Sequence, residues 1–110
     1  MTRPQQIDLA ALQAAAGQAC GLLRTLANPN RLVLLCQMTQ GEFCVSDLEV
    51  LTGIQQPTLS QQLTVLREEK LVSTRREGKQ VLYSIASKRA MVVLEVLCAL
   101  YCPKEVERSH

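Results

Sequence analysis

The spacing of apolar residues predicts helices over most of the chain. Between residues 7 and 27, apolar side chains recur every three or four positions, which is the repeat of an amphipathic helix. Asn28 and Pro29 supply the cap and the first-turn proline of a second helix that ends near Gly41. Residues 87–102 are apolar around more than half of a helix, which is more surface than one small domain covers. The chain is therefore predicted to be mainly α-helical.

Residues 46–70 are predicted to form two short helices joined by a tight turn. Ser46 and Glu49 have the spacing of a capping box for the first helix, and Gly53 ends it. Pro57 begins the second helix. The apolar stripe of this second helix consists of Leu59, Leu63 and Leu66. The arrangement is a helix-turn-helix, in which the second helix enters the major groove of DNA.

The other face of the second helix is polar and almost uncharged, with Glu68 and Glu69 confined to its last turn. Glutamine can pair with adenine through two hydrogen bonds, and hydroxyls can bond to bases or phosphates, whereas the DNA backbone repels carboxylates. We therefore predict a DNA-reading face, although a face that serves only solvation is the alternative for this helix alone. The residues predicted to contact DNA are Gln55, Gln56, Thr58, Ser60, Gln61 and Thr64.

Residues 71–86 alternate between apolar and polar positions, which predicts a β-hairpin. Arg75, Arg76 and Lys79 lie near its tip. The net charge is only +2, but residues 67–89 hold seven basic and three acidic side chains. A solvated charged loop is one explanation. A hairpin that directly follows a helix-turn-helix is typical of a wing, whose cations grip DNA phosphates.

Length and composition fit one domain spanning residues 1–110, with 47% hydrophobic residues for a modest core. The longest apolar stretch, at residues 90–102, is too short for a membrane span and includes Glu95. No signal peptide is recognised. The five cysteines lack the dense spacing of a secreted disulfide scaffold, so reduced thiols and a cytoplasmic location are expected.

The sequence argues against an enzyme. The chain has no histidine beside a cysteine, no convergent pair of carboxylates and no glycine-rich phosphate loop. A thiol redox enzyme is the alternative of another class, but it would lack a positioned base. We expect no catalytic residue, no cofactor and no resident metal.

The apolar faces of residues 7–27 and 87–102 require a cover. A two-fold dimer formed through these helices would bury them and would place two recognition helices about one turn of DNA apart, roughly 34 Å. A monomer whose terminal helices pair only with each other is the alternative. The predicted architecture is a homodimeric winged helix-turn-helix.

Three segments, LANPNRLVLLCQM, PTLSQQLTVLREEKLV and RREGKQVLYSI, resemble the ArsR/SmtB family of bacterial winged-helix repressors. The resemblance extends over nearly the whole chain. It implies a homodimer that binds an imperfect inverted repeat and is released when an inducer engages cysteines or other ligands. It also implies recognition residues around Gln56, Thr58, Ser60 and Gln61, with wing contacts around Arg75 and Lys79.

The family uses several inducer sites, and two of them are missing. Arsenic sensors carry Cys-Val-Cys where this chain has Cys44, Val45 and Ser46, and zinc sensors need a histidine on the last helix, whereas the single histidine here is His110. Cys44 with Cys102 is similar to the sulfide-responsive branch, whose cysteines react with persulfides or polysulfides. A helix N-terminus favours the thiolate of Cys44, which would leave Cys102 as the resolving thiol.

Other roles for the cysteines remain open. Cys98 and Cys102 share one helix face and can join Cys20 in a three-thiolate site for arsenite. Free cysteines are also often small core hydrophobes, and this interpretation is favoured for Cys20 and Cys36.

Overall fold

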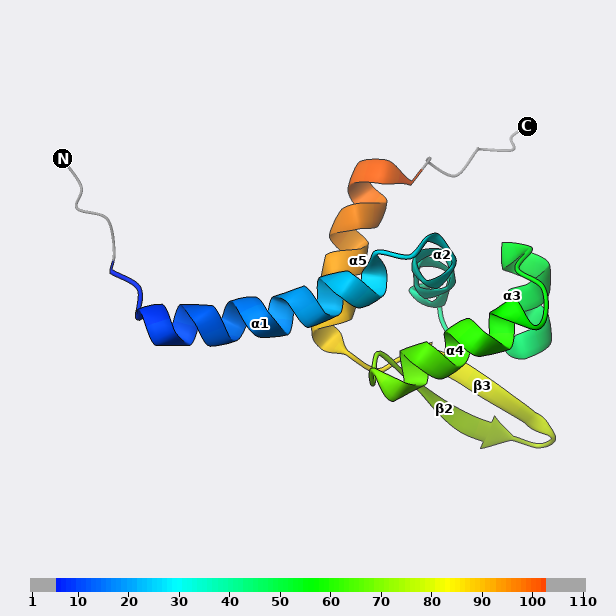
Figure 1. Cartoon of the computed structure of the whole chain (residues 1–110). Coiled ribbons are helices and arrows are strands. Elements are labelled where there is room, and N and C mark those ends of the chain that lie inside the picture. Colours follow the sequence, from blue (N-terminus) through cyan, green and yellow to red (C-terminus); the bar gives the residue numbers. More distant parts are fainter. Residues whose placement is uncertain (1–5, 103–110) are drawn as a thin grey trace.

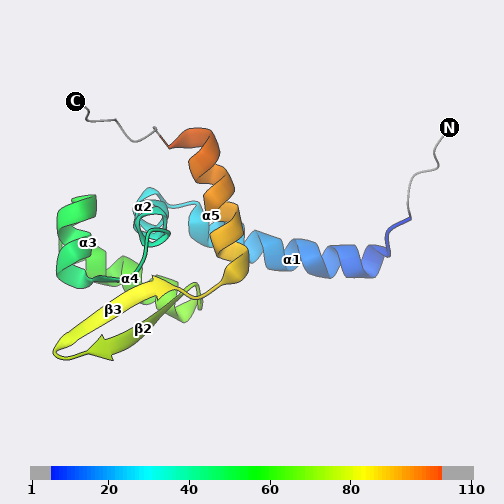
Figure 2. The ribbon, with the colours of Figure 1, turned by 180° about the vertical axis from the view of Figure 1, so that it is seen from behind.

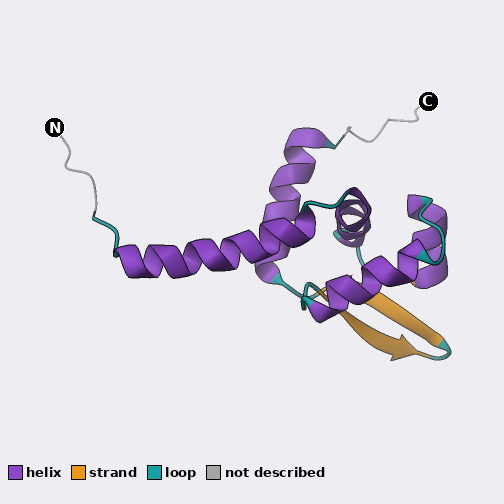
Figure 3. Ribbon diagram, in the orientation of Figure 1, coloured by secondary structure: helices purple, strands orange, loops and turns teal. Residues whose placement is uncertain are grey.

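The computed structural model describes residues 6–102 as a winged helix-turn-helix with five helices and three short strands (Figure 1). The helices are purple and the strands orange in Figure 3. In chain order the elements are α1 (Leu9–Leu26), α2 (Pro29–Met38), β1 (Phe43–Cys44), α3 (Val45–Thr52), α4 (Thr58–Glu68), β2 (Val72–Glu77), β3 (Gln80–Ile85) and α5 (Lys88–Tyr101). The predicted fold class, mainly α with a β-hairpin wing, is confirmed.

The core lies where α2, α3, α4 and α5 meet the sheet. The predicted leucine stripe of α4 points into it, because Leu59, Leu63 and Leu66 are at most 2% exposed. Burying one leucine side chain contributes roughly 1.5–3 kcal/mol. The opposite side of α4 is left facing solvent. The largest fully buried side chains are Leu34, Leu35, Met38, Leu48, Leu59, Leu63, Leu66 and Leu94.

Local signals placed most helix ends correctly. The Asn28 side chain accepts a hydrogen bond from the backbone N–H of Arg31 at 3.1 Å, and Ser87 caps α5 in the same way through the N–H of Ala90. Gly53 ends α3 in the left-handed conformation with φ of 76°, where glycine is favoured.

The predicted cap at Ser46 is wrong. Helix α3 already begins at Val45, and Cys44 occupies the cap position without a capping side-chain hydrogen bond. Cys44 is also the last residue of strand β1, where it pairs with Leu82 of β3. Because this pairing fixes the backbone up to Cys44, the chain enters the helix two residues earlier than the capping box indicates.

The sheet is antiparallel with the strand order β1-β3-β2. The predicted hairpin is present, and its strands reach Glu77 and Gln80, which pair with each other. The turn between them consists of Gly78 and Lys79, with Gly78 at a φ of 64°. Strand β1 was not predicted, because two residues are too few to show an alternating pattern.

Helix α1 projects from the body of the molecule in both ribbon views (Figures 1 and 2). Only its last two residues, Thr25 and Leu26, are buried. Leu9, Leu12 and Leu23 are 46–65% exposed, and α5 also presents apolar side chains to solvent. No helix within residues 6–102 has the length and apolar character needed to cross a membrane.

Candidate nucleic-acid interface and thiol cluster

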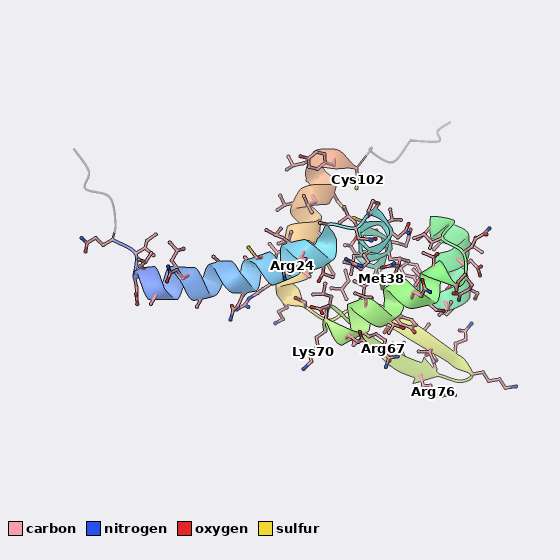
Figure 4. All side chains as sticks on the ribbon, in the orientation of Figure 1. Arg24, Met38, Arg67, Lys70, Arg76 and Cys102 are labelled. Atoms are coloured by element: carbon pink, nitrogen blue, oxygen red, sulfur yellow. The ribbon has the colours of Figure 1, made fainter. Side chains whose placement is uncertain are left out.

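The outer face of α4 presents Ser60, Gln61 and Thr64 to solvent, opposite the buried leucines. Arg67 continues this face, since it follows Ser60 by seven positions, or two helical turns. Figure 4 shows Arg67 and Lys70 at the end of α4 and Arg76 on the wing, along one edge of the molecule. Sequence reasoning did not name Arg67 as a contact, although it lies in the basic segment.

Two of the predicted contact residues also hold the backbone of α4. The Gln56 side-chain oxygen accepts a hydrogen bond from the Ser60 N–H at 3.0 Å and so caps the helix. The Thr64 hydroxyl donates to the Ser60 carbonyl at 2.9 Å. The Gln56 amide can still donate and the Thr64 oxygen can still accept, so each keeps one way to contact a ligand.

The turn between α3 and α4 borders an open polar hollow of about 520 Å³. Gln55, Gln56 and Thr58 lie there, together with Asn30 from the start of α2. Asn30 was missed, because its position beside the turn depends on how α2 packs against α4. Amides, hydroxyls and backbone N–H groups around such a hollow suit the oxygens of a phosphate.

Arg31 ties three helices together. Its Nε donates to the Thr25 carbonyl of α1 at 2.7 Å, and its Nη1 donates to Gln62 Oε1 of α4 at 3.1 Å. Arg31 therefore positions α4 relative to α1 and α2. Sequence reasoning missed this role, since the hydrophobic pattern carries no information on the partner of a polar residue.

The wing cations differ in their surroundings. Arg75 donates two hydrogen bonds to the carboxylate of Glu42, at 2.8 and 2.7 Å, and lies 3.6 Å from Glu77. The hydrogen bond from Arg75 lowers the pKa of Glu42, and the same bond raises the pKa of Arg75. Arg76 and Lys79 are exposed on the same hairpin. The wing thus holds one cation against an acid and presents two others to solvent.

A cluster of three thiols joins α2 to α5. The Sγ atoms of Cys36, Cys98 and Cys102 lie within 4.8 Å of one another, and the Cys98 thiol is 3.5 Å from that of Cys36. Cys36 and Cys98 are half-buried, whereas Cys102 is exposed at the end of α5 (Figure 4). Three soft sulfur atoms so close together can be oxidised in pairs or can hold a thiophilic ion.

The surroundings of the cluster favour its protonated form. Burial raises the pKa of Cys36 and of Cys98, and a hydrogen bond with Cys98 raises the pKa of Cys102. The thiols also repel one another's negative charge once ionised. The cluster is therefore held mostly as neutral thiols near neutral pH.

The remaining cysteines lie elsewhere. Cys44 is 6% exposed, and its sulfur lies 3.2 Å from the Ser46 hydroxyl and 3.8 Å from the Gln80 amide. Cys20 is exposed on α1 and does not belong to the three-thiol group found within residues 6–102. The structure therefore brings Cys102 to Cys36 and Cys98, and it does not bring Cys102 to Cys44. It favours Cys36 over both Cys44 and Cys20 as the partner of the cysteines on α5.

Comparison with known proteins agrees with this geometry. The family described as "Bacterial regulatory protein, arsR family" matches residues 28–74. The "Biofilm growth-associated repressor" of Agrobacterium fabrum is 49% identical over 100 residues, which cover 91% of this chain and 86% of that protein. The chain belongs to the ArsR family. Because the relatives of this ArsR-family chain are regulators, they confirm the prediction that it is not an enzyme.

Solved ArsR-family structures share the fold. The crystal structure of the repressor BigR from Xylella fastidiosa has a TM-score of 0.80 at 41% identity, over 89% of this chain and all of that one. A homodimeric winged helix-turn-helix domain from Mycobacterium bovis has a TM-score of 0.69 at 30% identity, over 98% and 97% of the two chains. The ArsR match at residues 28–74 spans α2 to the first half of β2 and leaves out α1, β3 and α5.

Proposed function

We propose that this ArsR-family protein is a repressor that binds an inverted-repeat operator as a homodimer. The observation that carries the proposal is the exposed polar face of α4, opposite three buried leucines and beside a basic wing. Helix α4 lies in the major groove, where Gln61 and its neighbours read base edges. Arg76 and Lys79 contact phosphates or the minor groove.

The dimer is formed through α1 and α5. Their exposed apolar residues have no cover within residues 6–102, and they include Leu9, Val92, Val96 and Leu100 at 52–70% exposure. The radius of gyration is 17.1 Å, compared with about 13 Å for a compact domain of this length. The homodimeric relative from Mycobacterium bovis supports the same assembly.

Control of DNA binding is assigned to the thiol cluster, with Cys36 joined to a cysteine of α5 after reaction with a persulfide. Sulfur transfer from R–S–SH to one thiolate releases RSH. Attack of the second thiolate on the new cysteine persulfide releases hydrogen sulfide and leaves a disulfide. The two cysteine sulfurs are oxidised, and the persulfide is reduced.

Cys36 is the obligatory partner in this reaction. Cys98 lies on α5 and Cys102 caps its end four positions later, with its backbone N–H bonded to the Cys98 carbonyl, which places their Cβ atoms about 5–6 Å apart. A disulfide requires Cβ atoms about 3.5–4.5 Å apart, so these two cysteines cannot close a bond within an intact helix. Oxidation therefore links α2 to α5.

This link connects the dimer helix to the DNA-reading unit. Arg31, also on α2, is hydrogen-bonded to Gln62 of α4, so a shift of α2 toward α5 is transmitted to the recognition helix. A change in the separation of the two α4 helices weakens binding to both half-sites at once.

Arsenite is a second candidate inducer, favoured by the proximity of three sulfur atoms. Trivalent arsenic prefers soft thiolates, and Cys36 would take the place that the sequence assigned to Cys20. Intact mass distinguishes the two candidates. Arsenic bound to three thiols adds one arsenic and removes three hydrogens, whereas a disulfide removes two hydrogens and adds nothing.

Gln61→Ala and Arg76→Ala should weaken DNA binding in different ways. The first should relax base preference at one operator position, because it removes a base contact. The second should weaken binding to all sequences and lower the log-log salt slope by about 0.9 per protomer. Fluorescence anisotropy with operator and scrambled duplexes over a salt series measures both effects. Equal loss of discrimination in the two variants would contradict this division of roles.

Glu42→Gln should strengthen DNA binding by a few fold without regard to sequence. The substitution removes the acid that holds Arg75, so a third wing cation becomes available for phosphate and the salt slope steepens by about 0.9 per protomer. The same anisotropy series provides the measurement. Glu95→Gln on α5 is the matched control, since it changes the charge equally on another element. A similar gain in both variants would assign the effect to net charge alone.

Alkylation of the cluster by iodoacetamide should accelerate with pH up to and beyond 9.0, the ordinary thiol pKa. A raised pKa means that the reactive thiolate forms at higher pH, so the rate rises about tenfold per pH unit below that pKa. Peptide mapping at timed intervals gives the rate at each cysteine. A rate that levels off below pH 9.0 would show that the thiolates form more easily than burial allows.

A further inference from the structure

The thiol cluster lies in an apolar groove. The sensing reaction described above uses the sulfur atoms and assigns no role to the rest of the groove. The groove has a volume of about 500 Å³ between α2 and the end of α5. Among residues 6–102, none of the side chains that line it is charged. These residues are Leu32, Val33, Cys36, Gln37, Thr39, Gln40, Cys98 and Cys102.

The groove continues from the sulfur atoms along α2. Cys36 lies one helical turn after Leu32 and three positions after Val33, so all three occupy the same side of α2. The Val33 side chain is 46% exposed at the rim of the groove, and Cys102 is exposed at the other side of the groove. A molecule whose reactive atom reaches the thiols therefore places its substituent against Leu32 and Val33.

The lining favours one class of substituent. An apolar organic group loses water contact when it enters the groove, which is favourable. A substituent with carboxylates or an ammonium group would lose hydration without gaining a charged partner from this lining of described residues. We propose that the groove selects organic hydropersulfides, R–S–SH, in which R is apolar, over charged persulfides such as glutathione hydropersulfide.

The inference rests on the proposed persulfide reaction and adds its substrate class. With R in the groove, the outer sulfur passes to a cluster thiolate and RSH departs. A second thiolate then displaces hydrogen sulfide and forms the disulfide, so that R–S–SH and two thiols give RSH, hydrogen sulfide and one disulfide. Holding R orients the sulfur toward the thiols and raises the reaction rate.

The test compares three reagents on the full chain: benzyl hydropersulfide, glutathione hydropersulfide and inorganic tetrasulfide. Intact mass at timed intervals gives the rate of cross-linking. Wild type should react with the benzyl reagent on the order of tenfold faster than with the glutathione reagent. Val33→Asn should remove most of this preference and leave the tetrasulfide rate unchanged. Val33→Lys should shift the preference toward glutathione hydropersulfide, because its cation attracts the carboxylates.

A control keeps the two proposals distinguishable. Val50→Asn alters a valine that is 82% exposed on α3 and should leave all three rates unchanged. Equal rates for benzyl and glutathione reagents in wild type, or an unchanged preference in both Val33 variants, would overturn the groove proposal alone. Failure of tetrasulfide to cross-link the wild-type cluster would instead overturn the proposed persulfide reaction.

Discussion

Replacing Cys36 with serine is expected to abolish release from DNA by persulfide while operator affinity in the absence of inducer stays within about twofold of wild type. Cys36 provides the sulfur on α2, and the two cysteines of α5 cannot close a disulfide with each other. The side chain lies outside the α4 face, so base contacts are retained. Anisotropy with operator DNA, before and after treatment with tetrasulfide, measures both properties.

Cys44→Ser and Cys20→Ser are the matched controls. Each removes one sulfur from outside the cluster, so both variants should respond like wild type. Peptide mapping should find Cys36 cross-linked to Cys98 or Cys102 in all proteins that keep Cys36. A normal response from Cys36→Ser together with a lost response from Cys44→Ser would support the pair Cys44 and Cys102 inferred from the sequence.

The sequence indicated the pair Cys44 and Cys102, whereas the structure groups Cys102 with Cys36 and Cys98. This difference shows which kinds of feature the sequence can predict. The leucine stripe of α4, the cap at Asn28 and the glycine at the end of α3 are read from residues within a few positions of one another. Such local signals fixed the helix-turn-helix and the hairpin. They also placed the polar face of α4 on the outside, because its opposite face had to be buried.

The thiol cluster depends on how α2 packs against α5, and no local pattern specifies that packing. Cys36 and Cys98 are 62 positions apart, and Cys36 lies on the apolar side of its helix, where a cysteine is read as a core residue. The Arg75–Glu42 pair, separated by 33 positions, was missed for the same reason. The spacing of Cys98 and Cys102 was the one visible signal, and it identified two of the three thiols.

Introducing aspartate at both Val96 and Leu100 is expected to convert the protein to monomers and to lower operator affinity by about a hundredfold or more. Val92, Val96 and Leu100 follow each other at four-residue intervals along α5 and are 52–70% exposed. Two carboxylates on this stripe cannot be buried against a second subunit without a large desolvation cost. Sedimentation velocity measures the assembly, and anisotropy with the full operator measures the affinity.

A half-site duplex separates loss of assembly from loss of folding. In the monomer, α4, the wing and the Arg31 hydrogen bonds lie away from the altered stripe, so affinity for a half-site should stay within about twofold of wild type. Val50→Asp on α3 introduces a carboxylate at a site that is 82% exposed and should leave the dimer intact. A double variant that remains dimeric would exclude α5 from the interface. Two joined protomers bind an inverted repeat more tightly than one protomer does. A monomeric variant with full operator affinity would contradict the dimer proposal, because it would show that one recognition helix suffices.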